Sequence, residues 1–402
     1  MEKLREVKNA AKRGAKRFLI TLMVCLALMV TTDLCYADNA EVLPKGRSAI
    51  FIEGKFYFPV DERYGPDGDE EDVAVDFNSN LDSRIFPLPP GASLGRSVVS
   101  FEYDFTIIEL NYAYGITDQL SFGIKIPYWD VANNVDAALD TTNATIGKNP
   151  LAPGGFAPIG TPGTQPLTAT DIQKLLVRNY GIEPIESWSR RGISDIEGML
   201  RYQYYKSDNW RLAATAGIRF PTGREDDPDS LVDYPFGTGA WAGLFRVHSD
   251  YIGTKNLMLS GTLKYDLYLP DHKVMRIPDD VNQPLTPNQE KVERDIGDFF
   301  ELELSGTYEF FKGLSFFLTY KFGYKWRDDI SGSMGYAYDV AEAETNAKEH
   351  VYIVGFQYST VSSYLAKEFP IPIVGFIGYR NRFAGENLLK SDYIDVGLTV
   401  YF

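Results

Sequence analysis

Between residues 38 and 402 the sequence contains no cysteine, because both cysteines of the 402-residue chain, Cys25 and Cys35, lie in its first 37 residues. That part of the chain can form no disulfide, offers no thiolate to a metal and has no cysteine nucleophile. Histidine is also scarce, with His248, His272 and His350 the only ones in the chain. These absences remove most residue types that hold transition metals or act as general bases.

Long apolar runs are absent after residue 37, so this part of the chain cannot cross a membrane as helices. Basic residues are also in deficit. The chain has 40 basic and 55 acidic residues, of which residues 1–37 hold seven and three. The remaining 33 and 52 give residues 38–402 a net charge of −19. Nucleic acid is therefore excluded as a partner, because phosphate binding needs basic clusters.

The amino terminus has the three parts of a secretory signal. Seven basic residues within 1–17 precede an uncharged apolar run at 18–30, and Cys35-Tyr36-Ala37 ends in a small residue. The run is shorter than the about 20 residues of a spanning helix, although an uncleaved membrane anchor is the alternative. Bulky Leu34 before Cys35 does not fit a lipoprotein. We predict that residues 1–37 are a cleaved signal peptide and that residues 38–402 form one domain.

The last residues of the chain show the clearest strand pattern. Ile394, Val396, Leu398, Val400 and Phe402 alternate with small, polar or acidic residues. Successive side chains of a strand point to opposite faces, so one face of this strand is entirely apolar. A chain that ends on the last residue of such a face is typical of an outer-membrane barrel, whose final strand closes against the first. We predict that Phe402 is a membrane-insertion signal for the barrel assembly machinery.

The same period-2 alternation recurs in about twelve segments, the number expected for a transmembrane antiparallel up-and-down β-barrel of the all-β class. In residues 314–326 every even position is apolar or aromatic, which suits a lipid-facing band of roughly 25 Å with aromatic girdles. A helix is expected only near 170–177. In the second strand, near 99–114, the phase slips at 106–108 and predicts a bulge.

Short and long connections alternate along the chain. Short ones are predicted at 115–118, 206–209, 253–256 and 311–313, and long ones at 60–97, 130–192, 221–239, 270–297 and 327–349. This asymmetry is typical of short periplasmic turns and long extracellular loops. A closed barrel also leaves no unpaired strand edge in lipid.

The opposite phase of each strand predicts the side chains that face the barrel lumen. These candidates are Glu53, Lys55, Lys125, Arg201, Arg211, Arg219, Arg246, Lys264, Asp266, Glu301, Glu303, Lys321, Lys325, Arg380, Arg382 and Asp395, with Glu109, Glu197 and Glu309 beside them. Two interpretations remain open. Opposite charges on neighbouring strands could fill the interior as a lattice of ion pairs, or they could form a charged constriction that selects solutes.

Catalysis and metal binding find little support. Outer-membrane lipid hydrolases need a Ser within hydrogen-bond reach of a His, yet Ser249 follows His248 directly and points to the opposite strand face. His272 and His350 have no Ser two residues away. The acidic run 67–72 lacks the ligand spacing of a Ca²⁺ loop. We expect no enzyme activity, no metal and no cofactor.

One motif resembles a known family. Residues 112–128 combine a Tyr-Gly-Ile-Thr-Asp turn with a strand that ends in Pro-Tyr, and residues 217–223 and 395–402 echo the pattern. The motif is similar to that of the outer-membrane proteins grouped as the phenol-degradation meta-pathway transporter-like family. The resemblance implies passage of small molecules, aromatic or hydrophobic ones among them, through the bacterial outer membrane.

The sequence thus predicts an outer-membrane channel for passive passage of small solutes. Outer-membrane lipid and lipopolysaccharide are the expected surroundings, and the oligomeric state stays open. The first alternative is a non-conducting surface barrel whose acidic loops bind a partner or adhere. The second, an outer-membrane lipid hydrolase, fits the scarce histidines less well.

Overall fold

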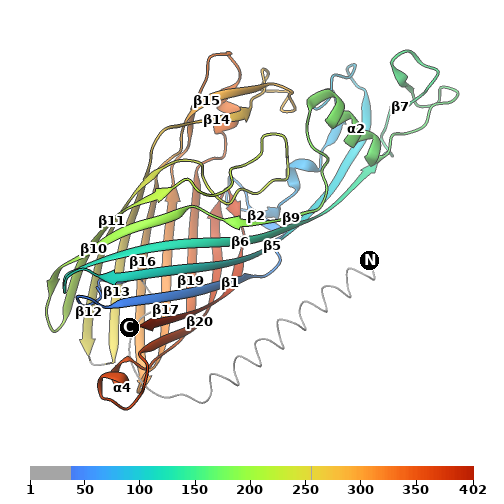
Figure 1. Cartoon of the computed structure of the whole chain (residues 1–402). Coiled ribbons are helices and arrows are strands. Elements are labelled where there is room, and N and C mark those ends of the chain that lie inside the picture. The colour runs from blue at the N-terminus through green and yellow to red at the C-terminus, as the bar shows by residue number, and fades with distance from the viewer. Residues whose placement is uncertain (1–37, 255) are drawn as a thin grey trace.

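Twelve antiparallel strands form a closed barrel in the computed structural model, which describes residues 38–254 and 256–402 (Figure 1). The predicted signal peptide at 1–37 lies outside the described residues. The barrel strands are β1 (Ser48–Tyr57), β5 (Ser93–Gly115), β6 (Leu120–Asp140), β10 (Ile196–Lys206), β11 (Trp210–Phe220), β12 (Ala242–Thr254), β13 (Leu257–Tyr268), β16 (Phe299–Phe311), β17 (Leu314–Lys325), β19 (Ala347–Ser359), β20 (Ile373–Glu386) and β22 (Asp392–Tyr401). The last strand, β22, pairs with both β20 and β1, which confirms the predicted closure.

The connections differ in length between the two ends of the barrel. Turns at 116–119, 207–209 and 312–313 lie at one end, called here the short-turn end, together with residues 360–372 and the carboxyl terminus (Figure 1). Most connections at the opposite, long-loop end are long, and 387–391 is the exception. The predicted asymmetry is therefore confirmed. Among the described residues, no helix is both long enough and apolar enough to cross a membrane.

The long-loop end carries several small elements of its own. They are β2 (Glu62–Tyr64), β3 (Glu70–Asp72), η1 (Val75–Phe77), β4 (Asn80–Asp82), β7 (Ile146–Lys148), η2 (Pro153–Gly155), β8 (Phe156–Pro158), α2 (Ala169–Tyr180), β9 (Trp188–Ile193), β14 (Asp271–Arg276), β15 (Gln289–Asp295), β18 (Asp329–Ser331), α3 (Tyr338–Glu342) and β21 (Leu388–Leu389), while α4 (Val361–Leu365) lies at the short-turn end. The helix predicted near 170–177 is confirmed as the centre of α2.

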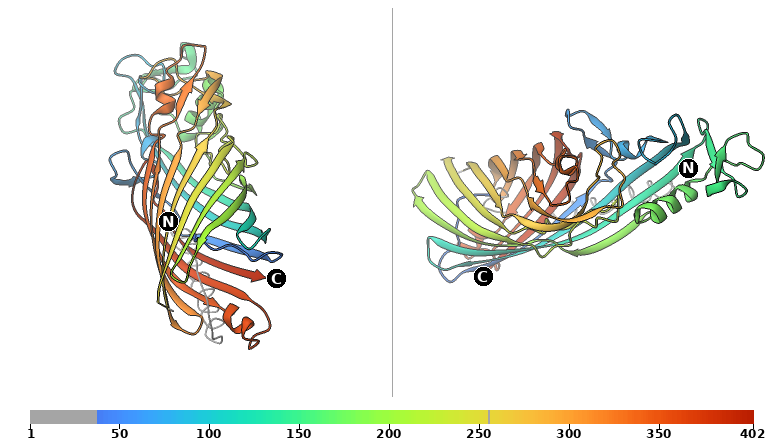
Figure 2. Two further views of the ribbon diagram at one scale, coloured as in Figure 1. Left: turned by 90° about the vertical axis from the view of Figure 1, so that its left-hand side faces the viewer. Right: turned by 90° about the horizontal axis from the view of Figure 1, so that it is seen from above.

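Two sequence predictions about the β5–β6 hairpin are wrong. The third strand does not end before residue 130 but continues to Asp140, and the hairpin projects beyond the barrel towards α2 (Figure 2). Residues 130–140 of β6 pair with residues 96–106 of the equally extended β5. The strand therefore continues past the point where its outward residues become polar. The bulge expected at 106–108 is also absent, because β5 keeps an unbroken register with both neighbours. The apparent phase slip arises because the inward residues of β5 are apolar up to Ile107 and become polar at Glu109.

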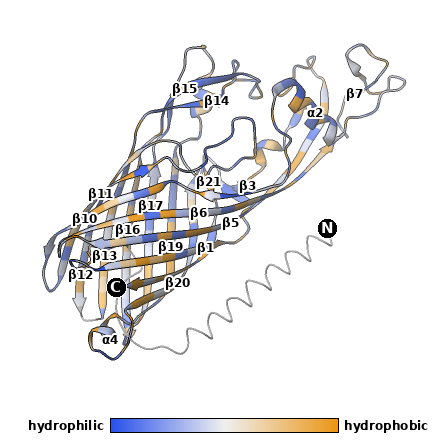
Figure 3. Ribbon diagram, in the orientation of Figure 1, coloured by the Kyte–Doolittle hydropathy of each residue, from blue (hydrophilic) through white to orange (hydrophobic). Residues whose placement is uncertain are grey.

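The outer face of the barrel is apolar, as the sequence predicts. Hydrophobic and hydrophilic residues alternate along the barrel strands (Figure 3). On β17, Phe316 and Leu318 are exposed on the outside, whereas Phe317 and Thr319 between them are fully buried. This arrangement places the apolar positions against lipid and leaves the other phase for the interior.

Part of the interior is filled by aromatic side chains that pack on glycine. Phe317 and Phe376 form a buried cluster with Val351 and Ile353, and Phe51 packs against it. A Cβ on Gly397 would lie 2.2 Å from the Phe376 ring, so only glycine fits there. This cluster closes one side of the barrel interior near the short-turn end.

The α2 helix at the long-loop end begins with a capping box formed by Thr168 and Asp171. Thr168 accepts a hydrogen bond from the Asp171 amide, and the Asp171 side chain accepts one from the Thr168 amide. Because T168A removes this cap, the variant should lower the stability of α2 by about 1 kcal/mol. We expect faster hydrogen exchange at 169–180 in T168A and no change in T161A, an exposed control; equal exchange in both variants would contradict the role of the cap.

The same helix should respond to acid. Hydrogen bonds from Lys148 and from Thr168 lower the pKa of Asp171 to about 2. A carboxyl with a lowered folded-state pKa stabilises the fold above its ordinary range and loses that contribution as the pH falls through about 2. We expect the protection factors of the amides at 169–180, which are corrected for the intrinsic pH dependence of exchange, to be steady from neutral pH to the ordinary range of an Asp and to fall below it. In D171N this acid-induced loss of protection should be absent.

Candidate solute pathway in the barrel interior

The first described residues lie inside the barrel rather than outside it. The N-terminal segment (residues 38–45) enters from the short-turn end, and Ala40 is fully buried. Its backbone is held by side chains of the barrel wall, since the Ala40 amide donates to Asp250 (3.0 Å) and Gln203 donates to the Ala40 carbonyl (2.7 Å). Nearer the short-turn end, the Leu43 amide donates to the Ser121 hydroxyl (2.9 Å). The segment therefore occupies part of the lumen.

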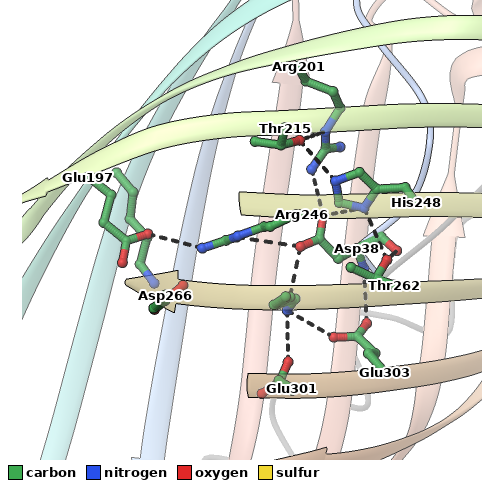
Figure 4. Close-up of polar contacts among 12 residues, drawn as sticks. Asp38, Glu197, Arg201, Thr215, Arg246, His248, Thr262, Asp266, Glu301 and Glu303 are labelled. Carbon is green, nitrogen blue, oxygen red and sulfur yellow. Dashed lines mark hydrogen bonds and ion pairs between the residues drawn. The ribbon is translucent and has the colours of Figure 1, made fainter. Parts of the chain in front are cut away.

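Asp38 is the centre of the charged groups that hold this segment (Figure 4). Its carboxylate lies 2.5 Å from Arg201, 3.5 Å from Arg246 and 3.5 Å from Lys264. The Asp38 amide donates to Glu303 at 3.1 Å. Three cations from β10, β12 and β13 thus converge on one carboxylate, which offsets the cost of burying it.

Ion pairs continue around the wall from strand to strand. Lys264 bridges Glu301 (2.9 Å) and Glu303 (3.1 Å), and Lys321 contacts Glu303 at 2.8 Å. On the far side, Lys55 of β1 contacts Glu109 of β5 at 2.7 Å. The pairing of charges on neighbouring strands, expected as one of two interpretations, is present in the structure.

A cavity of 590 Å³ lies between the N-terminal segment and the opposite barrel wall. Its charged lining includes Glu53, Lys55, Glu109, Lys125, Arg201, Arg246, Lys264, Glu301, Glu303, Lys321 and Arg380, and its apolar lining includes Phe51, Ile353, Val374 and Phe376. Charged side chains therefore line most of the circumference of the cavity, and the aromatic and aliphatic side chains form one apolar wall near the short-turn ends of β1, β19 and β20.

Aromatic rings cover the long-loop side of the cavity. Tyr234, from the loop 221–241, packs against Phe105 (4.9 Å between ring centroids), Tyr103 (5.8 Å) and Trp129 (6.1 Å). Tyr57 of β1 adjoins Phe105 at 5.4 Å. These five rings, called here the aromatic layer, pack where an inward-folded loop meets the inward faces of β1, β5 and β6.

The loop that supplies Tyr234 is fixed by Asp233. This fully buried carboxylate pairs with Arg190 and, at 2.7 Å, with Arg224, and it also accepts the Asp227 amide. Burial alone would raise the pKa of Asp233, but hydrogen bonds from Arg224 and the Asp227 amide hold it below the usual range. The carboxylate is thus charged at neutral pH, and its contribution is lost as the pH falls below that range.

Neutralising Asp233 should therefore loosen the loop. In D233N the two arginines lose their anionic partner, at a cost of about 1–3 kcal/mol. Since residues 38–402 contain no cysteine, A240C introduces a single buried thiol into this loop. We expect maleimide to label A240C slowly and the D233N/A240C double variant much faster. D208N/A240C, changed in an exposed turn, should label at the slow rate; equal rates in all three would refute the anchoring.

Ten of the sixteen predicted lumen-lining residues border the cavity. The other six lie elsewhere along the inward face. Arg211 pairs with Glu41, Arg219 with Glu197 and Asp266, Lys325 with Asp328, and Arg382 with Glu349, while Asp395 is buried opposite Lys55 in the β1–β22 register. Glu309 instead accepts the Gly313 amide at a turn.

Two of the three histidines make hydrogen bonds to hydroxyl groups of neighbouring strands. His248 is fully buried, and its two ring nitrogens lie at hydrogen-bond distance from the hydroxyl groups of Thr215 (2.9 Å) and Thr262 (3.0 Å). His350 contacts the Tyr320 hydroxyl at 2.8 Å. Among the residues that the structure describes, no group of three or more His, Cys, Asp or Glu side chains is placed to hold a metal ion.

Sequence reasoning missed three parts of the interior. They are the N-terminal segment, the aromatic layer, and Gln357 with the apolar wall around Phe376. The alternation on β5 could have revealed the second, because Phe101, Tyr103 and Phe105 share the inward phase of Glu109. Nothing local to residues 38–45 indicates that they enter the lumen.

Comparisons with known proteins agree with this architecture. An outer membrane channel from Pseudomonas putida F1 is similar over 92% of this chain and 100% of that chain, with 13% identity and a TM-score of 0.53. The monoaromatic hydrocarbon channel CymD is 11% identical over 90% of this chain and 89% of that chain, with a TM-score of 0.36. The Ralstonia pickettii toluene transporter TbuX is 9% identical over 89% of this chain and 90% of that chain, with a TM-score of 0.35. No curated protein matched.

The first of these similarities establishes the fold as that of a bacterial outer-membrane barrel, so the long-loop end faces outward and the short-turn end faces the periplasm. A family model described as the putative MetA-pathway of phenol degradation matches residues 127–360, more than half of the chain. The chain therefore belongs to that family, as the motif at residues 112–128 predicts.

Proposed function

We propose that this protein is a passive outer-membrane channel for small solutes, aromatic or hydrophobic compounds among them. The observation that carries the proposal is the 590 Å³ cavity inside a closed barrel, with charged side chains around most of its circumference and an apolar wall of aromatic and aliphatic side chains. A cavity of this size suits a molecule of one or two rings. Family membership and the channels to which the fold is similar support the same conclusion.

The proposed route has two narrow points. From outside, a solute passes the aromatic layer around Tyr234, enters the cavity and leaves past the N-terminal segment. Passage in either direction needs the loop 221–241 and the N-terminal segment to shift. The sixteen predicted residues are proposed to line this route, and no step of it requires enzyme chemistry or a cofactor.

The remaining parts of the proposal concern the surroundings. Residues 1–37 are proposed to be removed as a signal peptide, so that the mature chain starts near Asp38. Phe402 is proposed as the signal that the barrel assembly machinery recognises, and lipid and lipopolysaccharide as the neighbours of the outer face.

A second function is favoured by one observation, the occupation of the lumen by the N-terminal segment and by the inward loop. A barrel sealed in this way would act through its acidic external loops, as a binding or adhesive surface. Single-channel conductance of the refolded mature protein in a planar bilayer separates the two. Discrete current steps that small aromatic solutes block support the channel, whereas a folded barrel without conductance at any voltage overturns it.

A further inference from the structure

The cavity contains a side-chain amide that has no hydrogen-bond partner among the described residues. Gln357 lies on the inward face of β19, lines the cavity and is 1% exposed. Within the described chain, neither its amide oxygen nor its amide nitrogen has a hydrogen-bond partner. The amide nitrogen of Asn111, on the β5 side of the same cavity, is also unpaired there. Buried polar groups without partners cost free energy and call for an explanation.

The surroundings of Gln357 are apolar. Phe376 is its register partner on β20, and the Phe376 ring lies 6.0 Å from that of Phe51. Ile353 and Val374 border the same part of the cavity. A molecule that reaches Gln357 therefore places its body against rings and aliphatic side chains.

The charged groups of the cavity do not favour an ionic ligand. Acidic and basic residues occur there in nearly equal number, and they contact one another, as Lys321 does Glu303 and Lys55 does Glu109. An anion or cation would have to displace one member of a buried pair, which leaves the other uncompensated. The unpaired amides can instead serve a neutral group without such a loss.

From these observations we infer that Gln357 forms a binding site for small, uncharged, hydroxyl-bearing molecules with an apolar ring or chain. The hydroxyl donates to the Gln357 amide oxygen or accepts from its amide nitrogen, while the apolar body packs on Phe376 and Phe51. Asn111 supplies a second donor from across the cavity. The inference rests on the proposed channel function and gives that channel a preferred class of solute.

The test uses three probes with one ring and different substituents, namely toluene, benzyl alcohol and benzoate. Equilibrium binding is measured with refolded full-length mature barrels of the wild type, Q357M and Q119M. Methionine keeps the length of Gln357 but lacks its amide. Q119M makes the same change in the exposed turn at 116–119 and serves as the matched control.

We expect the wild type to bind benzyl alcohol more tightly than benzoate. In Q357M the Kd for benzyl alcohol should rise about fivefold to tenfold, the usual effect of losing one hydrogen bond, while the Kd for toluene is unchanged or falls. Q119M should match the wild type. An equal loss for toluene and benzyl alcohol, or tighter binding of benzoate, overturns the inference.

Folding and conductance are measured on the same samples. If Q357M does not migrate as a folded, heat-modifiable barrel, N111L replaces it, with a smaller loss for benzyl alcohol expected and an unchanged Kd overturning the site. A wild-type protein that conducts but does not bind benzyl alcohol overturns the site and leaves the channel intact. A protein that binds benzyl alcohol but never conducts refutes the channel instead.

Discussion

Replacing Leu318 with arginine should prevent the barrel from assembling in the membrane. Leu318 lies on the outward face of β17 and is 51% exposed, so its side chain faces lipid. An arginine on the lipid face near the middle of the bilayer costs about 2–4 kcal/mol, a large part of the stability of a folded domain. We expect L318R to lose the heat-modifiable band on unheated gels and to be depleted from the outer membrane.

The control for this variant is a leucine-to-arginine substitution at a position that is exposed to water. Leu151 lies in an external loop and is 89% exposed. L151R should therefore assemble like the wild type. Normal assembly of L318R would show that the face assigned to lipid is wrong.

Deleting residues 38–44 should enlarge the conductance several-fold and make the pore select anions. The N-terminal segment fills part of the lumen and brings Asp38 against Arg201, Arg246 and Lys264. Without it, these three cations face an open, water-filled passage, and rings of fixed charge set the sign of the ions that pass. The reversal potential in a salt gradient measures this selectivity.

Two companion variants separate the loss of volume from the loss of charge. D38N keeps the segment in place and should change ion selectivity more than conductance. A deletion of residues 150–156, equal in length but in an external loop, should change neither property. If deletion of 38–44 leaves the conductance unaltered, the N-terminal segment does not obstruct the route.

The outer face could be predicted from the sequence because lipid imposes the same demand on every strand. Each outward position must be apolar whatever lies next to it, so the pattern at 314–326 or 394–402 identifies its strand without any knowledge of its neighbours. The number of strands, the closure of the barrel and the end that carries the long loops can all be predicted from this local pattern. Inward charges are also recorded locally, and ten of those predicted border the cavity.

The contents of the lumen could not be predicted in the same way, because they depend on segments that are distant in the chain. Phe105 is apolar on the inward face because other rings pack on it, among them Tyr234 from a later loop. Asp38 is one acidic residue among many until Arg201 and Lys264 converge on it. The polarity of an inward residue thus depends on which distant segment packs on it. The periodicity of the sequence does not identify that segment.

The position of residues 38–45 also limits when their native contacts can form. These residues leave the ribosome before the barrel strands, yet their contacts are made with β10, β12, β13 and β16, as far as 265 positions later in the chain. Their docking sites exist only after most of the wall has been built. The N-terminal segment can therefore reach its native position only together with, or after, the pairing of these strands, and its contacts are among the most non-local in the fold.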